Sequence, residues 1–235
     1  MSRLLTILAL AATLSPLAAC GPKSAQRSDS SSAASAAASA AAPPAARAPS
    51  APDPRVTAAD HARILGDAGA KVWVVVVSDF QCPYCAQWER ETAPQVIEEF
   101  VKTGKARLAF LNFPLRQHEN ALPAAEAAMC AGAQGKFWEM HDRIFQTQQE
   151  WSALPTSEPY FAAMARQLAL DLDAYNRCIG EHVMRPMILA DIDRATGGGA
   201  GSTPTFFVGS QVIAGAERIG TFRKAIGDAL AAHGQ

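Results

Sequence analysis

The chain has 235 residues, of which 49% are hydrophobic and 18% are charged, and its formal net charge is −1. A near-neutral chain lacks the basic excess of an electrostatic nucleic-acid binder. Its apolar content is too high for a protein that is disordered throughout. Its five cysteines are too few for a small disulfide-dense scaffold, so each of them needs its own explanation.

The amino terminus has the pattern of a bacterial export signal. A positive start, Met1-Ser2-Arg3, precedes an apolar run over residues 4–14, which is too short to span a bilayer comfortably. The run leads to Leu17-Ala18-Ala19-Cys20, which resembles the lipobox of bacterial lipoprotein precursors. The resemblance implies a signal peptide over residues 1–19 and a lipid on Cys20. The alternative is an ordinary signal peptide with an incidental cysteine.

The next segment has the composition of a tether. Residues 21–55 contain 13 Ala, 8 Ser and 6 Pro, and no Val, Ile, Leu, Met or aromatic residue. Such a segment cannot bury enough apolar surface to offset the entropy lost on ordering. We therefore expect a lipidated Cys20 with a disordered tether over residues 20–55, whose root-mean-square reach is about 33 Å.

The remainder, residues 56–235, has the length of one domain. The β-branched run Lys71–Ser78 predicts a buried strand, and Pro83–Lys102 has helical spacing that Pro94 should interrupt. A second strand is expected over Ala106–Phe113. This β-α-β order predicts two parallel strands.

Helices dominate the middle of this domain. Five helical segments are expected, with Asp171 as the N-cap of the fourth: Glu119–Ala133, Lys136–Gln149, Glu158–Leu168, Asp171–Ile179 and Val183–Arg194. Two apolar runs, 205–208 and 211–214, flank Gly209-Ser210 and predict a hairpin. A helix over Glu217–Ala232 completes an α/β domain with a helical insertion at about 118–197.

The chemistry is concentrated in Cys82-Pro83-Tyr84-Cys85, where the first strand meets the first helix. Cys82 falls at the helix N-terminus, where unpaired N–H groups and the helix dipole favour a thiolate. Pro83 suits the first helical position, and Cys85 follows one turn later as the resolving thiol. Half of a zinc site and an inert buried pair are the alternatives, but zinc normally needs a second Cys or His pair.

Three separated motifs resemble the DsbA-like thiol–disulfide oxidoreductases. They are Ser78-Asp79-Phe80-Gln81-Cys82-Pro83-Tyr84-Cys85, the run Gln134 to Asp142, and the run Ser202 to Gly209. The resemblance covers nearly all of residues 60–232. It implies a thioredoxin fold with an α-helical insertion, a cis Thr203–Pro204 peptide facing the cysteine pair, and substrate pairing through the backbone of Thr203. It implies active-site support from Pro83, Tyr84, Thr203 and Pro204.

The chain also departs from this family. Many relatives carry a buried carboxylate six residues before the first active cysteine, where this chain has Val76, and the strand alternation leaves the direction of Asp79 open. The strongest oxidants of the family have His between the cysteines, whereas this chain has Pro-Tyr. The Thr203 hydroxyl is a candidate hydrogen-bond partner of the Cys82 sulfur. These features leave oxidase and reductase directions open, and we favour an oxidase of intermediate potential.

Two cysteines remain after Cys20, Cys82 and Cys85 are assigned. Cys130 and Cys178 both fall in the helical insertion, and some relatives of the family carry a second, structural disulfide there, so we expect one between them. The alternative is two small buried apolar side chains.

We expect a periplasmic enzyme, anchored by lipid to a membrane. Gly21, rather than Asp, follows Cys20, which favours the outer membrane of a Gram-negative host. Its partners would be cysteine-containing proteins and a membrane or soluble redox partner, with no cofactor, no metal in the site and no nucleic acid. The alternative from another class is a lipoprotein whose cysteine pair carries a soft metal such as Cu(I).

Overall fold

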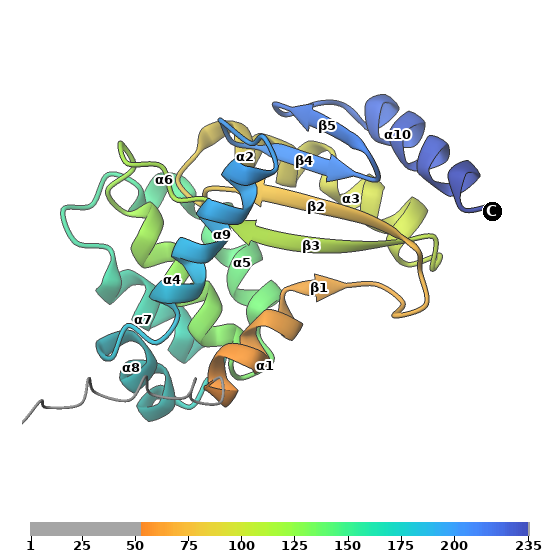
Figure 1. Ribbon diagram of the computed structural model, residues 1–235. Coiled ribbons are helices and arrows are strands. Elements are labelled where there is room, and N and C mark those ends of the chain that lie inside the picture. The colour runs from red at the N-terminus through yellow and green to blue at the C-terminus, as the bar shows by residue number, and fades with distance from the viewer. Residues whose placement is uncertain (1–52, 235) are drawn as a thin grey trace, which may run out of the picture. The chain divides into compact units, whose positions relative to one another are not determined.

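The computed structural model describes residues 53–234, and a five-stranded sheet forms its centre (Figure 1). The strand order is β1-β3-β2-β4-β5. β2 and β3 are parallel, whereas the other neighbouring pairs are antiparallel. The strands are β1 (Ile64–Leu65), β2 (Val72–Ser78), β3 (Ala106–Asn112), β4 (Thr205–Val208) and β5 (Gln211–Ala214). The predicted parallel pair and the predicted hairpin are both confirmed.

β2 is the central strand of the sheet because both of its edges are paired. Val74 and Val76 are buried on the face that packs against the main hydrophobic core. Val77, on the other face, belongs to a second, smaller apolar cluster. A continuous run of β-branched residues is what a strand covered on both faces requires, so this position follows directly from the sequence.

The helix that follows β2 is interrupted as predicted. α2 (Pro83–Glu91) ends at Thr92, and α3 (Ala93–Val96) continues into a π-helical turn, η1 (Ile97–Val101). Pro94 lies in the first turn of α3, where its missing N–H leaves no helical hydrogen bond unmade. The expected single helix over Pro83–Lys102 is therefore three segments.

Six helices lie between β3 and β4 and form the helical insertion, on the left in Figure 1. They are α4 (Ala121–Gly132), α5 (Phe137–Gln146), α6 (Gln148–Trp151), α7 (Glu158–Gln167), α8 (Leu172–Gly180) and α9 (Arg185–Gly197). The five expected helical segments are present, with the second divided between α5 and α6. Asp171 caps α8 as predicted, because its side chain accepts the N–H of Ala174. The last helix, α10 (Ile219–Ala232), follows β5.

The start of the domain differs from the expectation. Helix α1 (Pro54–Ala62) is capped by Asp53, whose carboxylate accepts the Arg55 N–H. The folded part therefore begins before Val56, and Asp53, Pro54 and Arg55 do not belong to a disordered tether. β1 was not predicted either. The expected signal peptide, the lipidated Cys20 and the tether up to residue 52 lie outside the described residues.

Candidate active site

Cys82 occupies the N-cap of α2, four residues after the last residue of β2, Ser78. Its backbone is extended (φ −72°, ψ 124°), and Pro83 is the first helical residue. The Cys82 N–H donates to the carbonyl of Asp79 at 3.1 Å, which tightens the turn between strand and helix. Cys82 therefore lies at the helix N-terminus that the sequence predicts, close to the unpaired first-turn N–H groups of α2, although its side chain accepts no capping hydrogen bond.

The two cysteines of the site have opposite pKa shifts. Cys82 and Cys85 are both free thiols, exposed by 4% and 1%. The pKa of Cys82 is lowered to about 6, mainly because the Cys85 thiol donates a hydrogen bond to its sulfur. This effect outweighs burial, and the Thr203 side chain and the N–H groups of Cys85 and Tyr84 make smaller contributions in the same direction. Burial, and then the neighbouring Cys82, raise the pKa of the Cys85 thiol well above its usual value. One sulfur is therefore ready to react as a thiolate, while the other holds its proton.

The loop before β4 lies against this pair. The Thr203–Pro204 peptide is cis, and the Cys82 thiol contacts the carbonyl oxygen of Thr203 at 3.5 Å. The Thr203 hydroxyl, suggested as a partner of the sulfur, is buried and makes no hydrogen bond of ordinary geometry within the described residues, although the Thr203 side chain contributes to the lowered pKa of Cys82. The hydrogen bond that the geometry shows is made by the Thr203 carbonyl.

Tyr84, like Pro83, is an exposed member of the motif. Its side chain is 63% accessible, although large aromatic side chains are usually buried. It lies beside a sulfur that a substrate must reach, so its ring is available to a bound partner.

No carboxylate occupies the position six residues before Cys82, because Val76 is there and is buried in the core. Asp79 lies closer to the cysteines. Its backbone N–H donates to Cys85 Sγ at 3.5 Å. Its buried carboxylate binds the N–H groups of Gln81 and Leu115 and contacts His118 Nδ1. The contact of Asp79 with Cys85 is therefore made by its backbone.

Two polar side chains, those of Gln148 and Gln81, brace the active-site loop and were not predicted. The Gln148 amide donates to the carbonyls of Phe80 and Cys82, at 2.7 and 3.0 Å. Gln81 accepts the Asn120 N–H at 2.8 Å and donates to the Ser152 carbonyl at 2.8 Å. These contacts tie the redox motif to the helical insertion. Because the partners lie 39 to 71 residues apart, no local sequence signal could have identified them.

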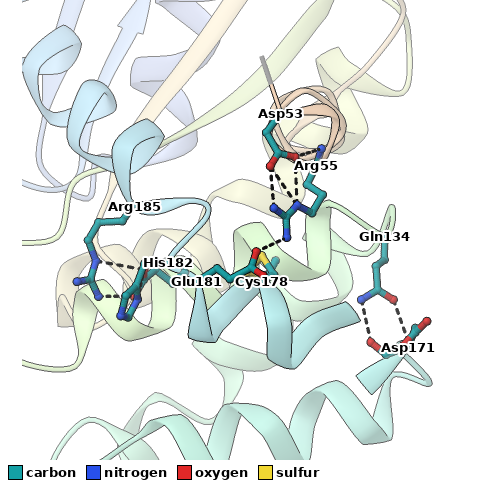
Figure 2. The surroundings of a disulfide bond; sticks show 10 residues. Asp53, Arg55, Gln134, Asp171, Cys178, Glu181, His182 and Arg185 are labelled. Carbon is teal, nitrogen blue, oxygen red and sulfur yellow. Dashed lines mark hydrogen bonds and ion pairs between the residues drawn. A yellow bond between two sulfur atoms is a disulfide. The ribbon is translucent and has the colours of Figure 1, made fainter. Parts of the chain in front are cut away.

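The remaining described cysteines are joined. Cys130 on α4 and Cys178 on α8 form a disulfide, with an S–S distance of 2.02 Å and a Cα–Cα distance of 5.9 Å. Figure 2 shows hydrogen bonds near this disulfide: Arg55 donates to Glu181, and the Gln134 side-chain amide pairs with the backbone of Asp171. The pairing is the one suggested by the sequence, and it fastens two helices of the insertion together.

Neither a metal cluster nor a membrane span is found among residues 53–234. They contain no group of three or more His, Cys, Asp or Glu side chains arranged to hold a metal ion. None of their helices combines the length and the apolarity needed to cross a membrane.

Comparison with known proteins identifies the class. A family model described as Thioredoxin matches residues 58–228, and the chain belongs to this family. The crystal structure of Wolbachia pipientis alpha-DsbA1 has the same fold, with a TM-score of 0.64 and 23% identity over 72% of this chain and 90% of that one. The fold is thus the thioredoxin fold with the helical insertion of DsbA proteins.

Two curated relatives are similar in sequence over part of their length. The chain is 36% identical over 173 residues to "Na(+)/H(+) antiporter NhaA 3" of Salinispora tropica, and the aligned region covers 73% of this chain and 25% of that protein. It is 31% identical over 137 residues to "Probable disulfide bond formation protein D" of Bacillus anthracis, and the aligned region covers 56% of this chain and 62% of that protein. The chain thus spans about a quarter of the antiporter.

Proposed function

We propose that this chain is a thiol–disulfide oxidoreductase that exchanges disulfides with protein cysteines through Cys82 and Cys85. The observation that carries the proposal is the pair of opposite pKa shifts at the N-terminus of α2, with Cys82 at about 6 and Cys85 well above its usual value. The relative named disulfide bond formation protein D supports the same activity.

The exchange proceeds in two steps from the oxidised pair. A substrate thiolate attacks Cys82 Sγ, the Cys82–Cys85 bond breaks, and Cys85 leaves as a thiolate that takes up a proton. A second substrate thiolate then attacks the substrate sulfur of the mixed disulfide, and Cys82 leaves as a thiolate. A low pKa makes Cys82 a good leaving group in this second step. The stabilised thiolate also favours the reduced protein, so the net direction is oxidation of the substrate.

The reduction potential tests the direction. We expect a value more oxidising than that of thioredoxin, about −270 mV, and less oxidising than that of DsbA, about −120 mV, measured by equilibration with glutathione buffers. Oxidised protein should convert a dithiol peptide to its disulfide with turnover in such a buffer. Cys82→Ser should abolish turnover, whereas Cys130→Ala/Cys178→Ala should keep it. A potential at or below the thioredoxin value would replace the oxidase assignment by a reductase one.

The proposal includes a location in the periplasm with a lipid anchor on Cys20, in the outer membrane. The apolar run over residues 4–14 and the lipobox-like Leu17-Ala18-Ala19-Cys20 support export and lipidation. The periplasm also suits the proposed activity, because a disulfide-forming enzyme needs an oxidising compartment. Labelling with a radioactive fatty acid should mark the full chain, and Cys20→Ala should remove the label and release the protein from membrane fractions. Label retained by Cys20→Ala would contradict the anchor.

A further inference from the structure

The carboxyl group of Asp79 is fully buried, and one of its contacts leads toward solvent. Oδ1 accepts the Gln81 N–H at 2.7 Å, and Oδ2 accepts the Leu115 N–H at 2.8 Å. Oδ2 also lies 2.7 Å from Nδ1 of His118. The Asp79 side chain is 0% exposed and that of His118 is 20% exposed. The pair therefore connects the interior of the site with its rim.

The backbone of Asp79 holds both cysteines. Its N–H donates to Cys85 Sγ at 3.5 Å, and its carbonyl accepts the Cys82 N–H at 3.1 Å. The side-chain contacts of Asp79 thus determine where these two backbone groups point. Leu115 and His118 both belong to the loop between β3 and α4. The Asp79 carboxyl group therefore fastens this loop to the redox motif, beside the contact of Gln81 with the Asn120 N–H.

We propose that Asp79 and His118 are positioning residues for the step in which Cys85 attacks a mixed disulfide on Cys82. The inference rests on the proposed function, because it concerns the same pair. In this step Cys85 releases its proton to solvent, and its sulfur forms a bond with Cys82 Sγ. The bond between Cys82 and the substrate sulfur breaks, and the substrate leaves as a thiolate that takes up a proton.

The Asp79 N–H is the donor that faces the charge forming on Cys85. A donor already aimed at a developing anion stabilises it without rearrangement. Such help matters most at Cys85, since its thiol is almost fully buried and burial disfavours its ionised form. Cys82 does not need this N–H, because the Cys85 thiol and, to a smaller extent, the N–H groups at the N-terminus of α2 already stabilise its thiolate. Loosening the Asp79–His118 contact should therefore slow the attack of Cys85 on the mixed disulfide and spare the formation of that disulfide on Cys82.

Reaction of the reduced protein with oxidised glutathione separates the two steps. Acid quenching at successive times gives the rate at which the mixed disulfide on Cys82 forms and the rate at which Cys85 resolves it. We expect His118→Ala and Asp79→Ala to slow resolution about tenfold and to leave formation within about twofold of the unmodified rate. His118→Asn should retain most of the rate, because its amide nitrogen can occupy the position of Nδ1 and donate to Asp79.

A matched control removes a histidine of another carboxylate pair. His182 lies 3.1 Å from Glu126 in the helical insertion, and His182→Ala should leave both steps unchanged. His118→Phe fills the space of the ring without a donor and substitutes for His118→Ala if that variant does not fold.

Three results would overturn the inference. They are resolution at the unmodified rate in His118→Phe, an equal slowing of both steps, and a rate for His118→Asn as low as that of His118→Ala. A complete absence of glutathione exchange by the unmodified protein would instead contradict the proposed function.

Discussion

The sulfur of Cys82 lies 3.5 Å from the carbonyl oxygen of Thr203, a residue 121 positions further along the chain. The register of the sheet brings them together, because β2 and β4 are antiparallel and Val77 is opposite Thr205. The loop before β4 therefore lies beside the turn that follows β2. This juxtaposition supports the proposal that a peptide reacting with Cys82 pairs with the Thr203 backbone, as in strand addition.

The first prediction concerns the ionisation of Cys82. In the reduced protein we expect an apparent pKa of about 6, measured from the ultraviolet absorbance of the thiolate. Cys85→Ala removes the hydrogen bond that is the largest cause of this lowering, so the pKa of Cys82 should rise toward its ordinary value, about 8.5. A value near 8.5 in the unmodified protein would contradict the proposed mechanism.

The same shift sets a pH dependence of stability for the reduced protein. The pKa of Cys82 is lower in the folded than in the unfolded chain, so the ionised sulfur contributes stability that is complete above about pH 8.5. The contribution is lost as the pH falls through about 6. Urea unfolding of the reduced protein and of Cys82→Ser across this window should show the difference shrinking toward acid pH. A difference independent of pH would rule out this linkage.

The second prediction concerns the disulfide between α4 and α8. Its cysteines are 48 residues apart, and closing a loop of this length stabilises the folded protein by about 4 kcal/mol in the chain-entropy description. Cys130→Ala/Cys178→Ala should therefore lower the free energy of unfolding by up to about this amount, with glutathione exchange at Cys82 unchanged. Peptide mapping without reductant provides the control, and two free thiols at these positions in Cys82→Ser/Cys85→Ser would contradict the assignment.

The elements that could be predicted from the sequence are those with a strong local pattern. The valine run of β2 and the Gly209-Ser210 turn between β4 and β5 are examples, and Gly209 has a positive φ of 58° that suits glycine. β1 was missed because it has only two residues, held by pairing with β3. α1 was missed because Pro54 and Arg55 continue the Ala- and Pro-rich composition before them, which concealed the Asp53 cap.

The candidate site likewise has one part that the local sequence predicts and another part that it does not. Cys82, Pro83 and Cys85 are contiguous, so their arrangement on a helix N-terminus could be predicted. The contact of Asp79 with His118 joins residues 39 apart, and that of Gln148 with Cys82 joins residues 66 apart. Such contacts depend on how the insertion packs on the sheet, which local propensity does not determine.

The third prediction concerns His141, which is buried among aromatic rings, including those of Phe80 and Trp138. Burial alone lowers the pKa of His141, but the carboxylates of Glu89 and Asp142 outweigh it and raise the pKa to about 9. The folded pKa lies above the unfolded value of about 6.5. The charged ring therefore contributes stability that is complete below about pH 6.5 and is lost as the pH rises through 9.

Unfolding experiments across this window test the prediction for His141. Between pH 6.5 and 9 the unmodified protein should lose roughly 3 kcal/mol of stability, and His141→Gln should lose much less. Glu89→Gln should also reduce the loss, because it removes one of the two carboxylates. Equal pH dependence in the unmodified protein and in His141→Gln would contradict a charged His141.

The last prediction concerns a buried ion pair between the end of α1 and α9. Arg63 Nη2 lies 3.1 Å from Asp191 Oδ1, and Nη1 contacts Oδ2. Both side chains are almost fully buried, and Asn112 at the end of β3 also donates to Asp191.

Removing Arg63 leaves the buried Asp191 charge with only the Asn112 donors and a longer contact, 3.5 Å, to the exposed Arg194. Arg63→Met should therefore lower the free energy of unfolding by about 3–5 kcal/mol. The loss in Arg63→Met/Asp191→Leu should be smaller than the sum of the two single losses, because the double variant removes both buried charges and leaves only the exposed Asp60 and Arg194 without these partners. The exposed pair of Lys224 and Asp228 provides the control, since Lys224→Ala should change stability by less than about 0.5 kcal/mol. Urea unfolding of the four proteins of the cycle measures the coupling, and single losses that add within about 0.5 kcal/mol would show that the pair contributes no interaction.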